Sequence, residues 1–344
     1  GIFNRQSAQK QAAKNGRRDP EHMFGCNPCS EIILRPYQFC NLSEVVVRES
    51  DTIETLKNKV RLATILGTFQ ATLTNFKYLR SIWKKNTEEE RLLGVSLTGI
   101  LDNKLLSGKD SNYGMNLSPV LGEMKSTAIT VNEKLSKELG ISQAAAITCV
   151  KPSGTVSQLV DSASGIHARH NPYYIRTVRG DNKDPLTQFM MAQGIPAEPD
   201  VMKPESTTVF SFPMKSPSSA VCRTDMTAIE QLDLWLTYQK NWCEHKPSVT
   251  ISVKEDEWFE VGSWVYENFD DVSGISFLPF SEHTYQQAPY QDCTKEEYEE
   301  MKAKMPSSID WTMLQEFEKE DTTSGGRELA CTAGVCEIVD IEAA

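Results

Sequence analysis

The chain alternates short apolar runs with amphipathic runs of about ten or more residues, and this alternation restricts the fold most. The strand candidates are residues 144–150, 173–178, 207–212, 248–253 and 274–278. Helical patterns span residues 53–79, 119–139, 185–193, 227–242 and 256–268, the first capped by Asp51 or Thr52. Because parallel neighbours need long connections, this order predicts an α/β fold with a parallel sheet and crossover helices. About five such strands make half a large barrel or one open sheet.

Composition narrows the classes of function. The 344 residues are 39% hydrophobic, enough for one large or two ordinary domains, and the formal net charge is −11. An acidic chain argues against nucleic acid as a partner, because phosphate neutralisation needs clustered Lys and Arg. An apolar run of about 18 residues is absent and the first twenty residues are polar, so we expect no membrane partner, no signal peptide and a cytoplasmic protein. The chain begins at Gly1 rather than Met, so we expect a fragment or one piece of a protein made in parts.

The nine cysteines are an odd number, and in a cytosolic protein they are expected to be thiols, with any disulfide catalytic and transient. Cys29 lies in Asn27-Pro28-Cys29-Ser30-Glu31, and Cys40 follows eleven residues later. This compact set of redox and proton-transfer groups is hard to explain by packing alone. Two alternatives stay open: Cys29 as a small buried hydrophobe, or Cys26 and Cys29 as a thioredoxin-like or zinc-binding pair. A zinc site would need two more ligands, and we assign no metal.

Lys151-Pro152-Ser153-Gly154-Thr155 directly follows the strand candidate that ends at Val150. A strand, a turn of small residues and a helix offer backbone N–H groups and the helix dipole to an anion. The segment lacks the spacing of a Walker motif, and a plain helix cap is the other interpretation. Residues 164–176 contain two histidines and two arginines, which could contact phosphates or a cofactor, although a solvated loop explains them equally well.

The end of the chain has a second pair of thiols. Residues 295–300 are rich in Glu and Lys, and residues 322–326 form a hinge of small residues. Cys331 and Cys336 follow the hinge. A mobile arm that exchanges with another disulfide is one interpretation, and a permanent disulfide is the other.

Five segments, in this order along the chain, together resemble ribonucleotide reductases. They are residues 27–31 with Cys40, 151–155, 207–213, 245–250 and 285–290. The gap from Cys29 to Cys40 and the spacing of the tail cysteines look most like the adenosylcobalamin-dependent (class II), monomeric ribonucleoside-triphosphate reductases. The resemblance implies the second half, about five parallel strands, of a ten-stranded α/β barrel. A finger loop near the N-terminus and a flexible C-terminal tail are implied with it.

The resemblance also implies roles for the residues near the N-terminus. Cys29 matches the transient thiyl radical that abstracts the ribose 3′-hydrogen, with adenosylcobalamin as the radical source. Glu31 matches the base for the 3′-hydroxyl proton, and Asn27 the amide that binds the ribose. Residues two apart in an extended loop face the same way, so all three side chains are expected to meet one sugar. Cys40 matches one of two thiols that reduce the 2′-carbon and end as a disulfide.

Further roles are implied for later residues. Ser153, Gly154 and Thr155 match the loop that cradles the phosphates of a ribonucleoside triphosphate. Cys331 and Cys336 match the tail pair that reduces the active-site disulfide before thioredoxin reduces the tail. The expected domains are a helix and finger loop (1–48), the half barrel (49–290), an acidic helical segment with a hinge (291–326) and the redox-active tail (327–344).

The chain departs from the family in what precedes Cys29. The second reducing thiol of the family lies far upstream, where this chain has only Cys26, and the first half of the barrel is missing as well. We therefore expect that the chain needs an N-terminal half, as a separate chain or a missing segment, and is inactive alone.

Three alternatives of function stay open. One is a small thiol–disulfide exchange module, and another is a nucleotide-binding subunit without catalysis. The presence of Asn27, Cys29, Glu31 and both tail cysteines argues against the second, because binding needs none of them. The third is a reductase of another class, but Tyr173 and Tyr174 are internal rather than a C-terminal tyrosine pair, and a C-terminal glycyl-radical motif is absent from the sequence.

Overall fold

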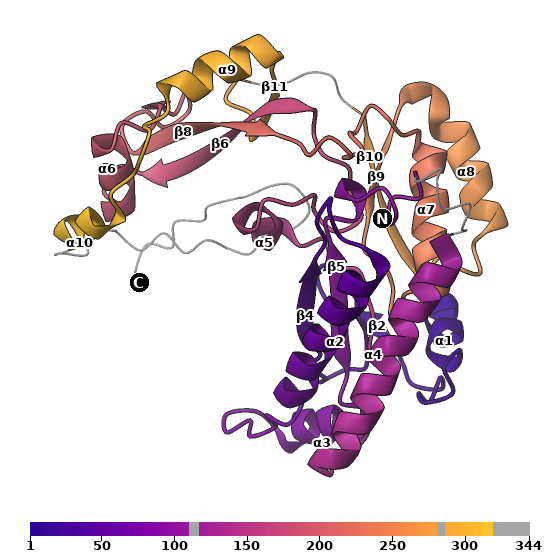
Figure 1. The fold of residues 1–344 in the computed structure, drawn as a ribbon. Helices are drawn as coiled ribbons and strands as arrows, with labels where there is room; N and C mark the ends of the chain where they lie inside the picture. The colour runs from indigo at the N-terminus through magenta and orange to yellow at the C-terminus, as the bar shows by residue number, and fades with distance from the viewer. Residues whose placement is uncertain (110–116, 281–285, 319–344) are drawn as a thin grey trace. The chain divides into compact units, whose positions relative to one another are not determined.

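A computed structural model describes residues 1–109, 117–280 and 286–318 of the chain (Figure 1). The described residues form two compact units: residues 1–169 with 217–280, without the gap at 110–116, and residues 170–216 with 286–318. The domain limits expected at residues 48, 290 and 326 remain predictions, and Cys331 and Cys336 lie outside the described residues. Within the described ranges, no helix is both long and apolar enough to cross a membrane.

The first unit contains a set of parallel strands. Their bounds are β4 (Asn41–Val46), β5 (Leu93–Thr98), β9 (Thr250–Val253) and β10 (Gly274–Pro279). β4 pairs in parallel with β5, and β9 pairs in parallel with β10. The short β1 (Ile2–Phe3) pairs antiparallel with β10.

Residues 146–150 join the two parallel pairs. The N–H groups of Leu93 and Val95 on β5 donate to the carbonyl groups of Ala146 and Ile147. On the other side, the Ser248 N–H donates to the Val150 carbonyl, at the start of the segment that becomes β9. Five parallel segments therefore lie side by side in the order of the chain. Five is also the number of strands that the sequence predicted for the half barrel.

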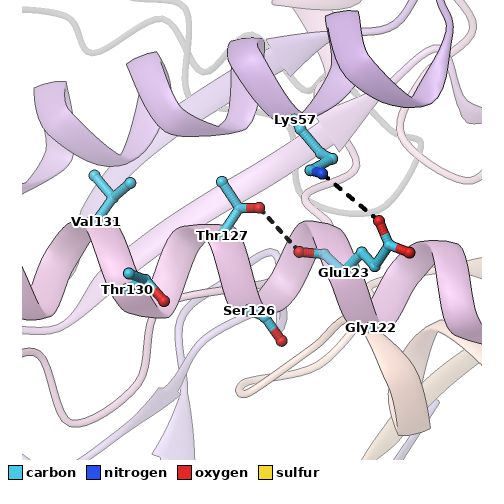
Figure 2. A pocket seen from close by; sticks show the side chains of 7 residues that line it. All are labelled: Lys57, Gly122, Glu123, Ser126, Thr127, Thr130 and Val131. Carbon is cyan, nitrogen blue, oxygen red and sulfur yellow. Dashed lines mark hydrogen bonds and ion pairs between the residues drawn. The ribbon is translucent and has the colours of Figure 1, made fainter.

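Helices connect these strands. In the first unit they are α1 (Arg5–Ala13), α2 (Ile53–Gln70), α3 (Ser81–Glu90), α4 (Leu117–Leu139), α5 (Gly154–Leu159), α7 (Ala228–Asn241) and α8 (Trp258–Glu267), with short 3₁₀ turns at Ile100–Asp102 and Glu255–Glu257. Thr52 caps α2 and Thr227 caps α7, each through a capping box. Between α2 and α4 lies an open depression of about 540 Å³, where Lys57 reaches Glu123 at 3.6 Å (Figure 2).

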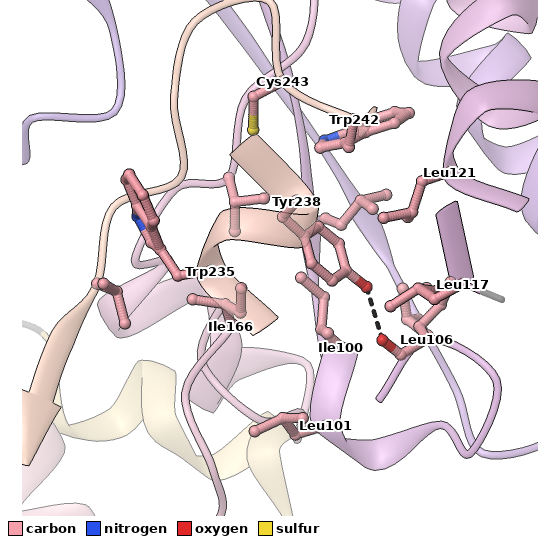
Figure 3. Close-up of a cluster of buried hydrophobic side chains, with 14 of the residues drawn as sticks. Ile100, Leu101, Leu106, Leu117, Leu121, Ile166, Trp235, Tyr238, Trp242 and Cys243 are labelled. Atoms are coloured by element: carbon pink, nitrogen blue, oxygen red, sulfur yellow. Dashed lines mark hydrogen bonds between the residues drawn. The ribbon is translucent and has the colours of Figure 1, made fainter. Parts of the chain in front are cut away.

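The core of the first unit lies between the sheet and its helices, and its largest side chains come from α7 and from Trp242, the residue that follows it. Trp235, Tyr238 and Trp242 are fully buried in it (Figure 3). The Tyr238 hydroxyl donates to the Leu106 carbonyl at 2.8 Å, and the Trp242 indole donates to the Cys149 carbonyl at 2.7 Å. Each polar group of these rings has an acceptor, so the rings bury large apolar area without leaving a donor unpaired.

The second unit is built on a different, antiparallel sheet in the order β11-β6-β8-β7. Its strands are β6 (Tyr173–Asp181), β7 (Ala197–Pro199), β8 (Thr207–Lys215) and β11 (Tyr290–Asp292). Its helices are α6 (Pro185–Ala192), α9 (Lys295–Lys304) and α10 (Leu314–Phe317), with a 3₁₀ turn at Trp311–Met313.

Two predicted strands of the parallel sheet were therefore assigned to the wrong sheet. Residues 173–178 and 207–212 do form strands, but they pair antiparallel with each other as β6 and β8. β4 and β5 take their places in the half barrel. Burial explains the difference: every residue of β5 is buried, as in a parallel sheet covered on both faces, whereas several residues of β6 are exposed.

The long helix predicted over residues 53–79 was also wrong at its end. α2 stops at Gln70, and turns lead to α3 at Ser81. The apolar pattern continues past Gln70, but Leu73 is 72% exposed, so its apolar side chain is not packed into the core. Most helix stability in proteins comes from packing of the apolar face, and here that packing ends before Leu73.

Candidate active site

The predicted finger loop is the tip of a small hairpin. β2 (Gly25–Cys26) pairs antiparallel with β3 (Ile33–Leu34), and residues 27–32 connect them. The Asn27 side-chain oxygen accepts the Ile32 N–H at 3.0 Å, and the Ser30 N–H donates to the Asn27 carbonyl at 2.9 Å. Asn27 thus uses its amide oxygen to shape the loop, which leaves its NH₂ group as the part suited to a ligand.

Residues 245–248, just before β9, hold this loop through hydrogen bonds to its backbone. The Ser248 hydroxyl donates to the Cys29 carbonyl at 2.6 Å, and the Lys246 N–H donates to the Glu31 carbonyl at 3.2 Å. His245 accepts the Ile33 N–H at Nδ1 (3.3 Å), so Nε2 carries the proton and donates to the Leu93 carbonyl at 2.9 Å. Burial lowers the pKa of His245 to about 3, which keeps the ring neutral.

Glu31 is the most unusual polar group of the loop. Its side chain is fully buried, and neither carboxylate oxygen has a hydrogen-bond partner among the described residues. The Lys151 Nζ lies 3.8 Å from Glu31 Oε1, too far for a hydrogen bond. Buried polar groups in proteins are nearly always hydrogen-bonded, so a buried carboxylate without a hydrogen-bond donor marks a place where a ligand is expected to donate.

The cysteines differ in their exposure. Cys29 and Cys40 are partly exposed, and Cys40 packs against Leu92 and residues 145–146. Although Cys40 is partly exposed as a residue, protein encloses its thiol; this burial raises the pKa of the thiol, and the charge of Glu31 raises it further. The seven cysteines in the described part of the chain form no disulfide with one another.

Cys149 is a neighbour that sequence reasoning did not assign. It is buried, and burial followed by the charges of Glu31 and Cys40 raises the pKa of its thiol. Its place in the strand candidate just before Lys151 was the one signal available in the sequence.

The predicted phosphate loop lies beside the same sheet. Ser153 is buried with φ of +63°, and its hydroxyl donates to Glu44 Oε2 on β4 at 2.9 Å. The Ser153 side chain makes no capping bond to α5, so the plain helix-cap interpretation does not hold for it. Burial raises the pKa of Glu44, while the bond from Ser153 and the Lys151 charge oppose the rise. Glu44 was also missed in the sequence.

The histidines and arginines of residues 164–176 are engaged within the protein. His167 is almost surrounded by protein, accepts the Thr250 N–H at Nε2 (3.0 Å) and bonds the Ser164 carbonyl at Nδ1 (2.9 Å). Burial lowers its pKa. Arg169 makes a bidentate ion pair with Asp102.

In the second unit, His170 lies 2.6 Å from Asp292, and Arg176 stacks over the Tyr290 ring. The solvated-loop interpretation is therefore wrong for these side chains. Across the described residues, the structure shows no cluster of three His, Cys, Asp or Glu residues that could hold a metal ion.

Comparisons with known proteins add the family relationship. No family model matches the chain. The chain is 29% identical to an adenosylcobalamin-dependent ribonucleoside-triphosphate reductase of Euglena gracilis, over 90% of this chain and 41% of the relative. It is 26% identical to the enzyme of the same name from Lactobacillus leichmannii, over 91% of this chain and 45% of the relative.

A solved structure agrees with these relatives. The crystal structure of a B-12 dependent (class II) ribonucleotide reductase matches with a TM-score of 0.73 and 24% identity, covering 87% of this chain and 44% of that one. The chain thus spans less than half the length of the proteins it matches. The predicted resemblance and fold class are confirmed: the chain is similar in sequence to part of the adenosylcobalamin-dependent ribonucleoside-triphosphate reductases and has the fold of the matching part of a class II ribonucleotide reductase.

Proposed function

We propose that this chain is the catalytic second half of an adenosylcobalamin-dependent reductase that converts ribonucleoside triphosphates to 2′-deoxyribonucleotides. The observation that supports it most is Glu31: a fully buried carboxylate without a donor, two residues from Cys29 on an anchored loop. A ribose hydroxyl is a donor of the required kind. The names and lengths of the relatives support the class of reaction and the need for further chain.

Three side chains of the finger loop act on the sugar in this proposal. Cys29 carries the thiyl radical and takes the 3′-hydrogen, and Glu31 takes the proton of the 3′-hydroxyl. Asn27 binds a ribose hydroxyl through the NH₂ group that the loop leaves available. Cys29 also fits the cofactor, because it is a partly exposed residue whereas Cys149 is buried. When bound, adenosylcobalamin supplies the radical by homolysis of its cobalt–carbon bond, chemistry that side chains cannot start.

The reducing electrons come from thiols. Cys40 and a second thiol each give up one electron and one proton: one proton leaves with the 2′-hydroxyl as water, the other hydrogen goes to C2′, and the two sulfur atoms end as a disulfide. The 3′-hydrogen then returns from Cys29 to C3′, which restores the thiyl radical. Cys331 and Cys336 exchange with this disulfide, and thioredoxin or an equivalent dithiol reduces the tail. The second thiol and the remaining strands belong to an N-terminal half. We place the complete enzyme in the cytoplasm.

Reconstitution tests the proposal. The chain is combined with the N-terminal half of a class II relative, adenosylcobalamin, a ribonucleoside triphosphate and a dithiol, and deoxynucleotide is measured. We expect product from the mixture and none from the chain alone. Turnover by the isolated chain would contradict the need for a second half, and a stable complex of the two halves without product would contradict the activity.

Cysteine variants then separate the roles. Cys29→Ser is expected to abolish product while nucleotide binding remains, and Cys40→Ser to block turnover, because one of the two thiols that reduce the 2′-carbon is lost. Cys149→Ser is the matched control, since it removes a neighbouring buried thiol that has no role in the proposal. A loss of multiple turnovers in Cys149→Ser would identify Cys149 as a reducing thiol instead.

A further inference from the structure

Three polar residues form a row across neighbouring strands beside the finger loop. Glu44 on β4 is paired in register with Ser96 on β5, and the Ser96 hydroxyl accepts the Lys151 N–H at 2.8 Å. Residues paired across neighbouring strands point to the same face of the sheet. The alternate residues Val45 and Val47 lie in the hydrophobic core, so Glu44 points to the other face.

Glu44 holds Ser153 in an unfavourable backbone conformation. A serine with φ of +63° lies in the left-handed region, a backbone conformation that residues other than Gly, Asn and Asp rarely adopt without support. The Glu44 carboxylate accepts the Ser153 hydroxyl at 2.9 Å and is the partner of this side chain. Ser164, whose hydroxyl donates to the Pro152 carbonyl, supports the turn on its other side.

Glu44 also belongs to the charge environment of Glu31. Glu44 Oε1 is buried without a hydrogen-bond partner in the described structure, as are both oxygens of Glu31. The charges of Glu31 and Lys151 both act on the pKa of Glu44, the first raising it and the second lowering it. The Lys151 ammonium group lies 3.8 Å from Glu31 on the finger loop, and its charge also acts on Glu44 on the sheet.

We propose that Glu44 is a positioning residue for nucleotide binding: by holding Ser153 it fixes the conformation in which the backbone N–H group of Thr155 meets the substrate phosphates, while the Gly154 N–H donates to the Pro152 carbonyl within the turn. The phosphate part of this inference rests on the function proposed above. Glu44 itself touches no substrate group in this account, because it acts through Ser153.

Titration calorimetry of the chain with cytidine triphosphate measures the effect on binding. Glu44→Ala is expected to weaken binding about tenfold, as for a lost charge-assisted hydrogen bond. Ser153→Ala should weaken it to a similar degree, and the double variant no further, since both changes break one link. Glu44→Gln keeps an acceptor for the Ser153 hydroxyl and should bind within about threefold of the unaltered chain, as expected when a neutral bond replaces a charged one.

Hydrogen exchange without nucleotide tests the same link independently. Glu44→Ala is expected to speed amide exchange in residues 153–157, and Glu44→Gln to leave it near the level of the unaltered chain. Glu49→Ala is the matched control: Glu49 also accepts a serine hydroxyl, that of Ser218 at 2.6 Å, but on the surface. It should change neither measurement.

The outcomes are distinguishable. Unchanged exchange in Glu44→Ala, or binding losses that multiply in the double variant, would overturn the role of Glu44. If the unaltered chain does not bind cytidine triphosphate, the phosphate role of residues 153–155 fails, and with it the positioning of a phosphate site. Faster exchange in Glu44→Ala would then show that Glu44 holds the loop for another purpose.

Discussion

Asp102 and Glu31 are both buried carboxylates of the first unit, and they are satisfied in opposite ways. Asp102 accepts Arg169 Nε at 2.8 Å and the Arg169 terminal nitrogen at 2.9 Å, and it accepts the Ala163 N–H at 2.8 Å as well. Glu31 accepts no hydrogen bond within the described structure. Asp102 therefore accepts its hydrogen bonds from within the protein, whereas the oxygens of Glu31 can still accept from a ligand.

The cations beside the two carboxylates also differ in how firmly they are held. The Arg169 side chain is 5% exposed and bonds both the side chain and the carbonyl of Asp161 as well, so it is held from several directions. The Lys151 side chain is 29% exposed and lies 3.8 Å from Glu31. A loosely held ammonium on a flexible stem can turn toward a phosphate, whereas a buried bidentate guanidinium cannot.

Removing Asp102 should have the largest effect on stability. Asp102→Ala leaves the buried Arg169 without its bidentate partner, and we expect a loss of about 3–5 kcal/mol in the free energy of unfolding. Urea denaturation measures it. Asp161→Ala is the control, because Asp161 is largely exposed and makes a single side-chain bond to Arg169. Equal losses of stability in the two variants would contradict the structural role of the ion pair between Asp102 and Arg169.

Acidification should have the next largest effect on stability, through His245, which bonds the backbone at the end of the Glu31 loop. The pKa of His245 is lowered from 6.5 to about 3 by burial, so the unfolded chain binds a proton more readily than the folded one between these values. Stability therefore falls as pH falls through this window, by about 1.4 kcal/mol per unit from this residue. Denaturation at about pH 7 and pH 5 should show a smaller fall in His245→Asn. An equal fall in both proteins would contradict the assignment.

Glu31→Gln should have a smaller effect, and of the opposite sign. Replacing a buried carboxylate that lacks donors by a neutral amide relieves desolvation, so we expect a gain of about 1 kcal/mol in the free energy of unfolding. Asp102→Asn should lose stability in the same assay, since the Arg169 charge loses its counterion. A loss in Glu31→Gln as large as in Asp102→Asn would break the comparison between the two carboxylates.

Glu44→Gln gives the smallest expected change, seen in its pH dependence. Burial raises the pKa of Glu44 above its usual 4.5, so the folded chain binds the proton more readily than the unfolded chain. The contribution of Glu44 to stability therefore falls as pH rises through its folded pKa. The stability of Glu44→Gln relative to the unaltered chain should rise between about pH 4 and pH 8. A constant difference would show that Glu44 does not titrate differently in the two states.

Local pattern predicted much of the fold. The apolar spacing located α7 and α4 within about two residues, which is the usual agreement for helix ends. The pairing of β6 with β8 was not predictable in the same way, because the order of strands and helices does not fix which strands share a sheet. β4 was missed because polar Asn41, Ser43 and Glu44 interrupt its apolar run.

The candidate site shows the same division. The loop residues Cys29 and Glu31 could be selected from sequence, because their spacing is local. Glu44 and Cys149 could not, since their places depend on the register between strands that are far apart in the chain. The signal for Glu44 was a charged residue within a valine-rich strand, which in a single sequence is also compatible with a solvated edge.

The central claim is that Cys29 is the radical carrier of an enzyme completed by another half. Electron paramagnetic resonance of the reconstituted protein, with adenosylcobalamin and a ribonucleoside triphosphate, tests it most directly. We expect a thiyl signal coupled to cob(II)alamin in the unaltered chain and in Cys149→Ser, and no such signal in Cys29→Ser. The same signal in Cys29→Ser, or none in a mixture that forms deoxynucleotide, would contradict it.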